Sequence, residues 1–439
     1  MSNFVVSVKK FNRPLESVRE LVELTGGFDR LRSTDHVFIK PNIVFWSKAV
    51  SFPKFGVITT SRIVEDMVIL LKDMGVSNIT IGEGTVVFDP KDKLTQKDAY
   101  LKLGYDLLAA RYGVKLFNVF EGSFQKVELC NGKSLNFSSE VMNSDFIVNI
   151  PVLKTHAQTV VSLGIKNMKG TIDIQSRKKC HSPNPGTDLN FMVSMLADRL
   201  PHGFTLIDGI FTNERGPGFD GKAHRSDIIA GSTDVLSADL VGAKLLGYSA
   251  DQVPHLAQAA RNRNRPTDLS DISIVGENIE SLIKFHDYSF PYNQDNSLPM
   301  PLQKLGISGI SYPKYDLSLC TYCSLLTGAV LTSIAMAWKG KKWNDVEILT
   351  GKIMKPTPGK KSILIGKCLY EANKDHPDKN NLIFVKTCPP QPEAILDALH
   401  KFDVDVAPEL LTNMEMVPAL FSKKYAEKTE FDDSFYQIQ

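Results

Sequence analysis

The chain has 439 residues, enough for roughly two or three domains, with 43% hydrophobic residues, 23% charged residues and a formal net charge of +2. This near-neutral balance, without a block of like charge, gives no reason to expect nucleic acid as a partner. The N-terminus lacks the apolar core of a signal peptide, and the longest apolar run, Leu325 to Trp338, is too short to span a bilayer. We therefore expect a cytoplasmic protein with no membrane partner and with reduced thiols.

Short β-branched runs alternate with helical stretches from about residue 35 to 280. The predicted strands are HVFIKPN (36–42), NITIGEG (78–84), VKLFNV (114–119), SDFIVNIPVL (144–153), FTLIDGI (204–210) and SDIIAG (226–231). The predicted helices cover residues 61–75, 99–113 and 237–247. This alternation predicts an α/β fold with a mostly parallel, doubly wound sheet.

Residues 284 to 315 are rich in Pro, Gly, Ser and Asn, which is typical of an irregular connection. After them the alternation resumes, with helices predicted at 324–338 and 391–401 and strands at 345–351, 361–368 and 381–388. We therefore predict a first α/β domain over residues 1–290, a linker over 291–315 and a smaller α/β domain over 316–439.

Four of the six cysteines fall in the last third of the chain: Cys320, Cys323, Cys368 and Cys388. The first two form a C-x-x-C just before a helix, and the other two each end a predicted strand. If these strands are parallel neighbours, their carboxyl ends lie side by side, where open α/β sheets place their ligands. The four thiols would then converge on one point and could ligate a metal.

Thiolate-only sites suit zinc or iron–sulfur clusters. A structural zinc site usually draws on two tight C-x-x-C pairs, whereas here one pair is followed by two dispersed cysteines. Dispersed ligands favour a larger [4Fe–4S] cluster, which four cysteines ordinarily hold. Zinc, or four core thiols that bind no metal, stay open as alternatives.

The stretch CPPQPEAILDAL, which starts at Cys388, reads as a sharp turn followed by a helix N-terminus, because proline suits the first helical turn. It resembles the motif around a cluster-binding cysteine in the 20-kDa-type subunit of respiratory NADH dehydrogenase and in related hydrogenase small subunits. That resemblance implies that Cys388 ligates a [4Fe–4S] cluster, toward which the helix N-terminus would direct partial positive charge.

Polar residues also follow the predicted strands of the first domain. The lysines would make a cationic floor for a carboxylate or phosphate, and His156 could act as general acid or base. The catalytic candidates are His156, Lys154, Lys166 and Glu214, and the substrate-binding candidates are Lys40, Asn42, Glu83, Asn167 and Lys169. The simpler alternative is that His156 is a structural residue and the lysines are solvated.

Two further segments of the first domain bear on these candidates. Residues 208–221, DGIFTNERGPGFDG, are predicted to be a glycine-rich loop with Asp208, Glu214 and Arg215, whose glycines would let Glu214 approach a ligand closely. The basic stretch SRKKCHSPNP (176–185) is predicted to be a solvated loop. Neither a G-x-G-x-x-G nor a Walker A motif occurs, so no nucleotide cofactor is indicated. A flavin, which has no reliable short signature, stays open.

Residues 36–250 resemble the family known as domain of unknown function 362, which is often found with iron–sulfur modules. The resemblance rests on IKPN, LKTHAQTVVSLGIKNMKG, IDGI…ERGPGFDG and SADLVGAKLLG, in this order. It implies the α/β fold class but no reaction. Many members carry ferredoxin-like runs of closely spaced cysteines, which this chain lacks.

Together these features predict a cytoplasmic [4Fe–4S] oxidoreductase that acts on a small anionic or polar substrate. Because one cluster passes one electron at a time, a low-potential electron donor such as ferredoxin is implied. One alternative is a non-catalytic iron–sulfur electron carrier or a subunit of a complex, and another is a zinc-stabilised lyase or transferase. The sequence leaves the oligomeric state open, a homo-oligomer included.

Overall fold

The computed structural model describes residues 4–87, 89, 92–130 and 132–439, and its chain divides into two compact units. Unit 1 comprises the residues up to Ser176, residues 190–289 and residues 421–439, and unit 2 comprises residues 177–189 and 290–420. The range 291–315, expected to be a linker, contains a helix and a strand of unit 2. Residues 421–439, expected in the smaller domain, are part of unit 1.

Unit 1 contains a large sheet, a separate hairpin and helices on both faces of the sheet. Its strands are β1 (Phe4–Lys10), β2 (His36–Lys40), β3 (Asn78–Glu83), β4 (Lys115–Asn118), β5 (Phe124–Cys130), β6 (Lys133–Ser138), β7 (Phe146–Asn149), β8 (Val152–His156), β9 (Val160–Val161), β10 (Gly203–Glu214), β11 (Lys222–Ser232) and β12 (Ile272–Gly276). Its helices are α1 (Glu16–Leu24), α2 (Ser61–Asp73), α3 (Leu94–Lys102), α4 (Tyr105–Tyr112), α5 (Ser139–Met142), α6 (Leu163–Asn167), α9 (Val235–Leu245) and α10 (Pro254–Asn262).

The strand order of the large sheet is β12-β1-β11-β10-β7-β2-β3-β4, with β8 paired to β10 and β9 paired to β8. The strands β10, β7, β2, β3 and β4 are mutually parallel, and β11 is antiparallel to both of its neighbours. The structure thus confirms the predicted α/β class and the mostly parallel sheet. The hairpin of β5 and β6 is separate from it.

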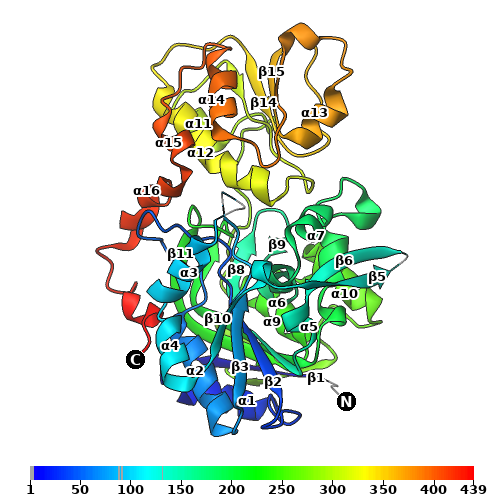
Figure 1. The fold of residues 1–439 in the computed structure, drawn as a ribbon, viewed down its shortest axis with the longest axis vertical. Coiled ribbons are helices and arrows are strands. Elements are labelled where there is room, and N and C mark those ends of the chain that lie inside the picture. Colours follow the sequence, from blue (N-terminus) through cyan, green and yellow to red (C-terminus); the bar gives the residue numbers. More distant parts are fainter. Residues whose placement is uncertain (1–3, 88, 90–91, 131) are drawn as a thin grey trace. The chain divides into compact units, whose positions relative to one another are not determined.

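Helices α1 and α9 cover opposite faces of this sheet. Gly231 of β11 lies against Leu21 of α1, whereas Gly242 of α9 lies against Ile207 of β10. Leu206, the cross-strand partner of Gly231, directly precedes Ile207, and successive strand residues point to opposite faces. Helices α2 and α4 continue the α1 layer, and α6 and α10 continue the α9 layer (Figure 1).

Three sequence predictions in unit 1 are wrong in their bounds. The run 144–153 forms two strands, because Pro151 has no N–H to continue the ladder and its carbonyl accepts from Asp208 N at 2.8 Å instead. The helix expected over 99–113 breaks at Gly104, which adopts φ 74°. The loop expected over 208–221 is strand up to Glu214, because β10 keeps pairing with β11 to that residue.

Unit 2 contains a four-stranded sheet in the order β13-β14-β15-β16, and every pair in it is parallel. Its strands are β13 (Ile310–Ser311), β14 (Val346–Leu349), β15 (Lys361–Ile365) and β16 (Leu382–Val385). Its helices are α11 (Met300–Lys304), α12 (Thr321–Ala337), α13 (Lys367–Asn373), α14 (Pro392–His400) and α15 (Glu409–Thr412). Figure 1 shows β14 and β15 side by side, with α13 following β15.

Three short helices span the positions in the sequence at which one unit ends and the other begins: α7 (Ile174–Lys179), α8 (Leu189–Ser194) and α16 (Ala419–Ser422). Over the residues that the structure describes, no helix combines the length and the apolar character needed to cross a membrane.

A glycine at the start of β10 tests how tightly the sheet of unit 1 is paired. A Cβ on Gly203 would lie 2.0 Å from the carbonyl oxygen of Ile147 on β7, so Gly203→Ala should force the strands apart. We expect the free energy of unfolding to fall by about 3 kcal/mol or more, measured by urea denaturation followed by circular dichroism.

The matched control is Gly328→Ala in α12, where an added Cβ meets open space. Alanine at that exposed helical position should raise the free energy of unfolding by up to about 1 kcal/mol. Wild-type stability of Gly203→Ala would contradict the tight pairing of β7 with β10.

Candidate functional site

Four thiols gather at one edge of the sheet of unit 2; we call Cys320, Cys323, Cys368 and Cys388 the cysteine group. Strands β15 and β16 are parallel, with Ile365 paired to Val385. Cys368 and Cys388 each lie three residues beyond this pair. The backbone pairing continues past the strand ends, because Gly366 N donates to Val385 O at 2.8 Å. Equal offsets beyond aligned strands therefore bring these two cysteines to the same edge.

The sequence placed Cys368 at the end of a strand, and the structure corrects this detail. Strand β15 stops at Ile365, and Cys368 lies in the first turn of α13, after Gly366 with φ 107°. The helix starts early because Gly366 turns the backbone in a conformation that other residues rarely adopt. Cys388 stays outside regular structure, between β16 and α14.

The C-x-x-C pair reaches the same edge from a helix N-terminus. Cys320 is the N-cap residue of α12, and Cys323 lies in its first turn. A Cβ on Gly366 would be 3.4 Å from Cys323 Sγ, so the pair lies beside the end of β15. The loop before Cys320 is also tied to the end of β14, since Lys352 N donates to Ser318 Oγ at 2.9 Å.

The thiols also act on one another electrostatically. A hydrogen bond from Cys323 lowers the pKa of Cys320 to about 5, against the effect of burial, with help from the backbone N–H groups of Tyr322 and Cys323. The pKa of Cys323 is raised by the same hydrogen bond, by burial and by the nearby charges of Cys320, Cys388 and Cys368. Desolvation raises the pKa of Cys368, which Lys352 opposes. The cysteine group therefore behaves as one electrostatic unit.

The spacing of the group bears on which metal could fit it. Four thiolates about 2.3 Å from one zinc ion would lie only about 3.8 Å apart. Within the described residues, no group of three or more His, Cys, Asp or Glu side chains is arranged to hold a metal ion. Ligands of a multi-iron cluster stand farther apart, since each binds a different iron. The four thiols lie at one edge, and two of them are exposed and one is buried. Their number and their sulfur donors match the ligands of a [4Fe–4S] cluster.

In unit 1, the ends of three neighbouring parallel strands carry the polar residues Asn149 (β7), Lys40 (β2) and Glu83 (β3). Lys40 is fully buried, and its ammonium donates to Glu83 Oε2 and to Pro41 O at 2.7 Å and to Asn167 Oδ1 at 3.2 Å. Glu83 also accepts from Ile43 N and Gly84 N. Lys40 therefore has its charge paired and its three donors used within the protein.

Lys154 joins the same network through Asn42. Its amine lies 2.7 Å from Asn42 Oδ1 and from Val57 O, and 3.3 Å from Pro217 O. Asn42 Nδ2 donates to Asn167 Oδ1 at 2.9 Å, which links the residue back to Lys40. Burial lowers the pKa of Lys154 to about 7, because its three acceptors carry no charge of their own. We call Lys40, Asn42, Glu83, Asn149, Lys154 and Asn167 the buried polar network.

Five sequence-predicted site residues thus meet in the buried polar network, and four others lie elsewhere or at its margin. His156, 9% exposed, follows Lys154 on the same face of β8, and its Nδ1 accepts from Gln158 N. Glu214 ends β10 and lies 3.5–3.6 Å from His224 and Lys222. Lys166, whose charge acts on the buried His255, and Lys169 are both half-buried.

The cationic floor expected from the sequence therefore takes a different form in the structure. Lys40 and Lys154 are 0% and 1% exposed, and protein oxygens accept their hydrogen bonds. A carboxylate or phosphate would have to displace those acceptors. A cavity of about 250 Å³ in unit 1 is lined by Asn149 and Arg263 among others, but Lys40, Lys154 and His156 are not among its lining residues.

Sequence reasoning missed two residues that organise this region. Asn149 donates to Gly164 O and accepts from Asn167 Nδ2, and it was missed because the predicted strand over 144–153 ran past the true end of β7 at Asn149. Asp239, fully buried on α9, accepts from Gly164 N at 2.6 Å and Ile165 N at 2.7 Å at the start of α6. Its signal was a lone acidic residue inside the apolar stretch SADLVGAKLLG.

The fold and the cysteine group define an α/β protein whose second unit carries a four-thiol edge. In a comparison with known proteins, residues 37–244 match the family described as domain of unknown function (DUF362). This match confirms the resemblance seen in the sequence.

Two individual proteins are also similar. Thylakoid-associated protein sll1697 of Synechocystis sp. is 26% identical over 259 residues, which are 58% of this chain and 76% of that protein. The lactate racemase apoprotein of Thermoanaerobacterium thermosaccharolyticum aligns over 96% of this chain and 80% of its own, with 14% identity and a TM-score of 0.37.

The buried amine of Lys154 generates a pH-dependent prediction. Lys154→Met leaves Asn42 and two carbonyl groups without their donor, so we expect the free energy of unfolding to fall by roughly 3 kcal/mol. Between pH 7 and about 10 the unfolded chain binds a proton at Lys154 that the folded chain has released, so the contribution of Lys154 rises with pH.

Urea denaturation of the wild type and Lys154→Met at pH 7, 8 and 9 measures both effects. The stability difference between them should grow across this range. Lys126→Met, at an exposed position of β5, is the control and should change little at any pH. A difference that shrinks with rising pH would contradict the lowered pKa.

Proposed function

We propose that unit 2 holds a [4Fe–4S] cluster through Cys320, Cys323, Cys368 and Cys388, and that the protein passes single electrons in an oxidoreductase reaction or chain. One observation carries the proposal: four thiols from two aligned strand ends and one helix N-terminus meet at one sheet edge. When bound, such a cluster supplies one-electron reduction and oxidation. The protein supplies the thiolates.

The surrounding elements support an anionic ligand at this edge. Cys320 lies at the N-terminus of α12, where the backbone N–H groups of the first turn and the helix dipole favour negative charge. Cys388 precedes α14, which begins with Pro392 and carries Gln391 as its N-cap. Cys368 and Cys388 are exposed, so electrons could reach the cluster from an external protein. We propose a low-potential donor such as ferredoxin, in the cytoplasm.

For the use of those electrons, the geometry favours a non-catalytic carrier or complex subunit over an enzyme. Lys40 and Lys154, expected to bind an anionic substrate, are buried and already hydrogen-bonded within unit 1. The exposed thiols of Cys368 and Cys388 suit electron exchange at a surface. If the protein is an enzyme, His156 is the candidate general acid or base, because this residue lies beside Lys154 and is not wholly buried.

Metal analysis of anaerobically purified protein tests the cluster. We expect about four iron and four acid-labile sulfide per chain, together with an EPR signal after dithionite reduction. Cys388→Ser should lower the iron content or change the spectrum, because it removes one thiolate. Cys130→Ser, in the β5–β6 hairpin of unit 1, should leave both unchanged.

The other outcomes are equally informative. Absence of iron and sulfide in the wild type would refute the cluster, and stoichiometric zinc without visible absorption would favour the zinc-stabilised lyase or transferase. An unchanged cluster in Cys388→Ser would remove this residue from the ligand set.

Reoxidation kinetics separate the carrier from the enzyme. The oxidised protein should take up electrons from reduced ferredoxin or reduced methyl viologen, and a panel of small carboxylates and phosphates should leave the visible spectrum of the reduced protein unchanged. His156→Ala should transfer electrons at the wild-type rate, because a carrier needs no acid or base. If one compound of the panel reoxidises the reduced cluster and His156→Ala abolishes this reaction, the protein is an enzyme instead.

A further inference from the structure

Residues 177–189, expected to form a solvated loop for the most part, are a fixed part of unit 2. Cys180 is fully buried and His181 is 3% exposed. His181 Nδ1 donates to Leu317 O at 3.1 Å, in the loop that leads to Cys320. Lys352 Nζ donates to the carbonyl oxygen of Lys178 at 3.0 Å. This segment, which we call the basic strap, is therefore anchored beside the cysteine group.

One lysine of the basic strap, Lys178, lies beside the cysteine group. Lys178 Nζ lies 3.9 Å from Cys388 Sγ and donates to it. The same ammonium lies 5.9 Å from the centroid of the Tyr322 ring, and Tyr322 stands between Cys320 and Cys323 in the chain. Lys178 therefore contacts both Cys388 and the C-x-x-C turn.

A second cation reaches the group from the end of β14. Lys352 is held at both ends, by Ser318 Oγ at its backbone N–H and by Lys178 O at its ammonium. The first bond holds its backbone beside the loop that leads to Cys320, and the second holds its ammonium beside Lys178. Both lysines are thus held at the sheet edge that carries the cysteine group, and Lys178 contacts one of its sulfurs.

We infer that Lys178 and Lys352 set the reduction potential of the cluster that the cysteine group would hold, an inference that rests on the proposed function. Reduction adds one negative charge, and a nearby cation stabilises the more negative state. Net charge and hydrogen bonds to the sulfurs are among the features that set cluster potentials. The two lysines therefore make the cluster easier to reduce than the thiols alone would allow.

The test is an anaerobic redox titration of the full-length protein, followed by the EPR signal of the reduced cluster. We compare the wild type with Lys178→Gln, Lys352→Gln and the double variant, after measuring iron and sulfide in each. The double variant should lower the equilibrium constant for one-electron reduction about tenfold, which is about 59 mV. Each single variant should give part of this shift.

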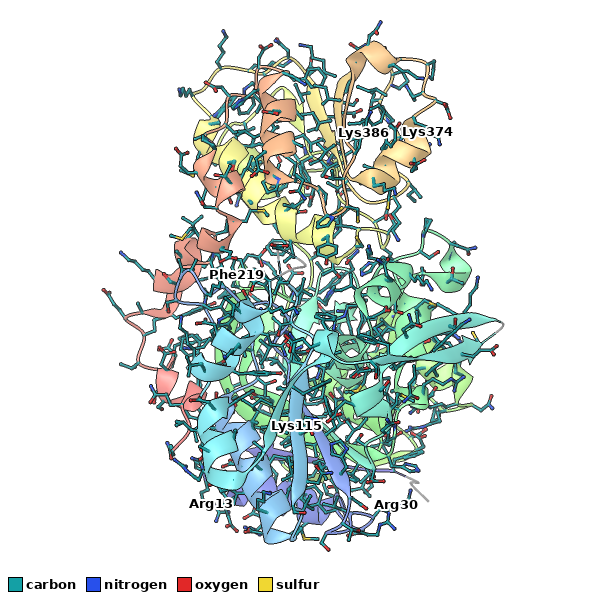
Figure 2. The ribbon with its side chains drawn as sticks, in the orientation of Figure 1. Arg13, Arg30, Lys115, Phe219, Lys374 and Lys386 are labelled. Carbon is teal, nitrogen blue, oxygen red and sulfur yellow. The ribbon has the colours of Figure 1, made fainter. Side chains whose placement is uncertain are left out.

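Two further variants control for charge and position. Lys178→Arg keeps the positive charge and should keep most of the wild-type potential. Lys374 is the exposed C-cap residue that follows α13, is paired with Glu371 at 3.0 Å and is labelled in Figure 2, and Lys374→Gln removes an equal charge from the same unit. It should leave the potential unchanged, because its charge is solvated and already paired.

The outcomes separate this inference from the proposed function. Wild-type protein without iron and sulfide overturns both, before any titration. If the double variant keeps its full iron content and the wild-type potential, only the role of the lysines is overturned. The same holds if both Lys178→Arg and Lys178→Gln lose the cluster. Cluster loss in Lys178→Gln with retention in Lys178→Arg supports a requirement for the charge.

Discussion

The register of parallel strands is the constraint on which both sites depend. In parallel pairs the carboxyl ends of neighbouring strands meet at one edge, so residues at equal offsets beyond those ends come together. In unit 2 this aligns Cys368 with Cys388, each three residues past the pair of Ile365 and Val385. In unit 1 it aligns Asn149, Lys40 and Glu83 at the ends of β7, β2 and β3. A slip of one residue in either register would separate these side chains and turn them to opposite faces.

The polar groups at the sheet edge of unit 1 and the thiols at the sheet edge of unit 2 have different surroundings. In unit 1 the charge of Lys40 is compensated by Glu83, and amide groups of Asn42 and Asn167 use the remaining donors and acceptors. Such a network is costly to break, because each lost partner leaves a buried polar group unsatisfied. In unit 2, Cys320 lies instead at the N-terminus of α12, and Lys178 donates to Cys388. That contrast supports the proposal of a structural role for the first edge and of a bound cluster at the second.

Sequence patterns predicted those parts of this arrangement that depend on residues close together in the chain. Alternating runs predicted the α/β class and most strands, and turn signals after each strand pointed to Lys40, Glu83 and Cys388. The bounds failed where pairing overrode local preference: β10 runs on to Glu214 because β11 pairs with it that far. The basic stretch around Lys178 was expected to be solvated, because nothing local indicates that Cys180 and His181 become buried.

By itself, the sequence determined that this is an α/β protein and showed four cysteines in its last third, from which a metal site was predicted, because periodicity and spacing are local properties. It also determined which polar residues follow the strands. Only the tertiary structure decided that Lys40 and Lys154 are buried and already hydrogen-bonded within unit 1, and that Lys178 lies 3.9 Å from Cys388 although 210 positions separate them in the chain. Contacts of that kind depend on which strands become neighbours and on where the chain re-enters unit 2, and no local pattern of residues encodes either.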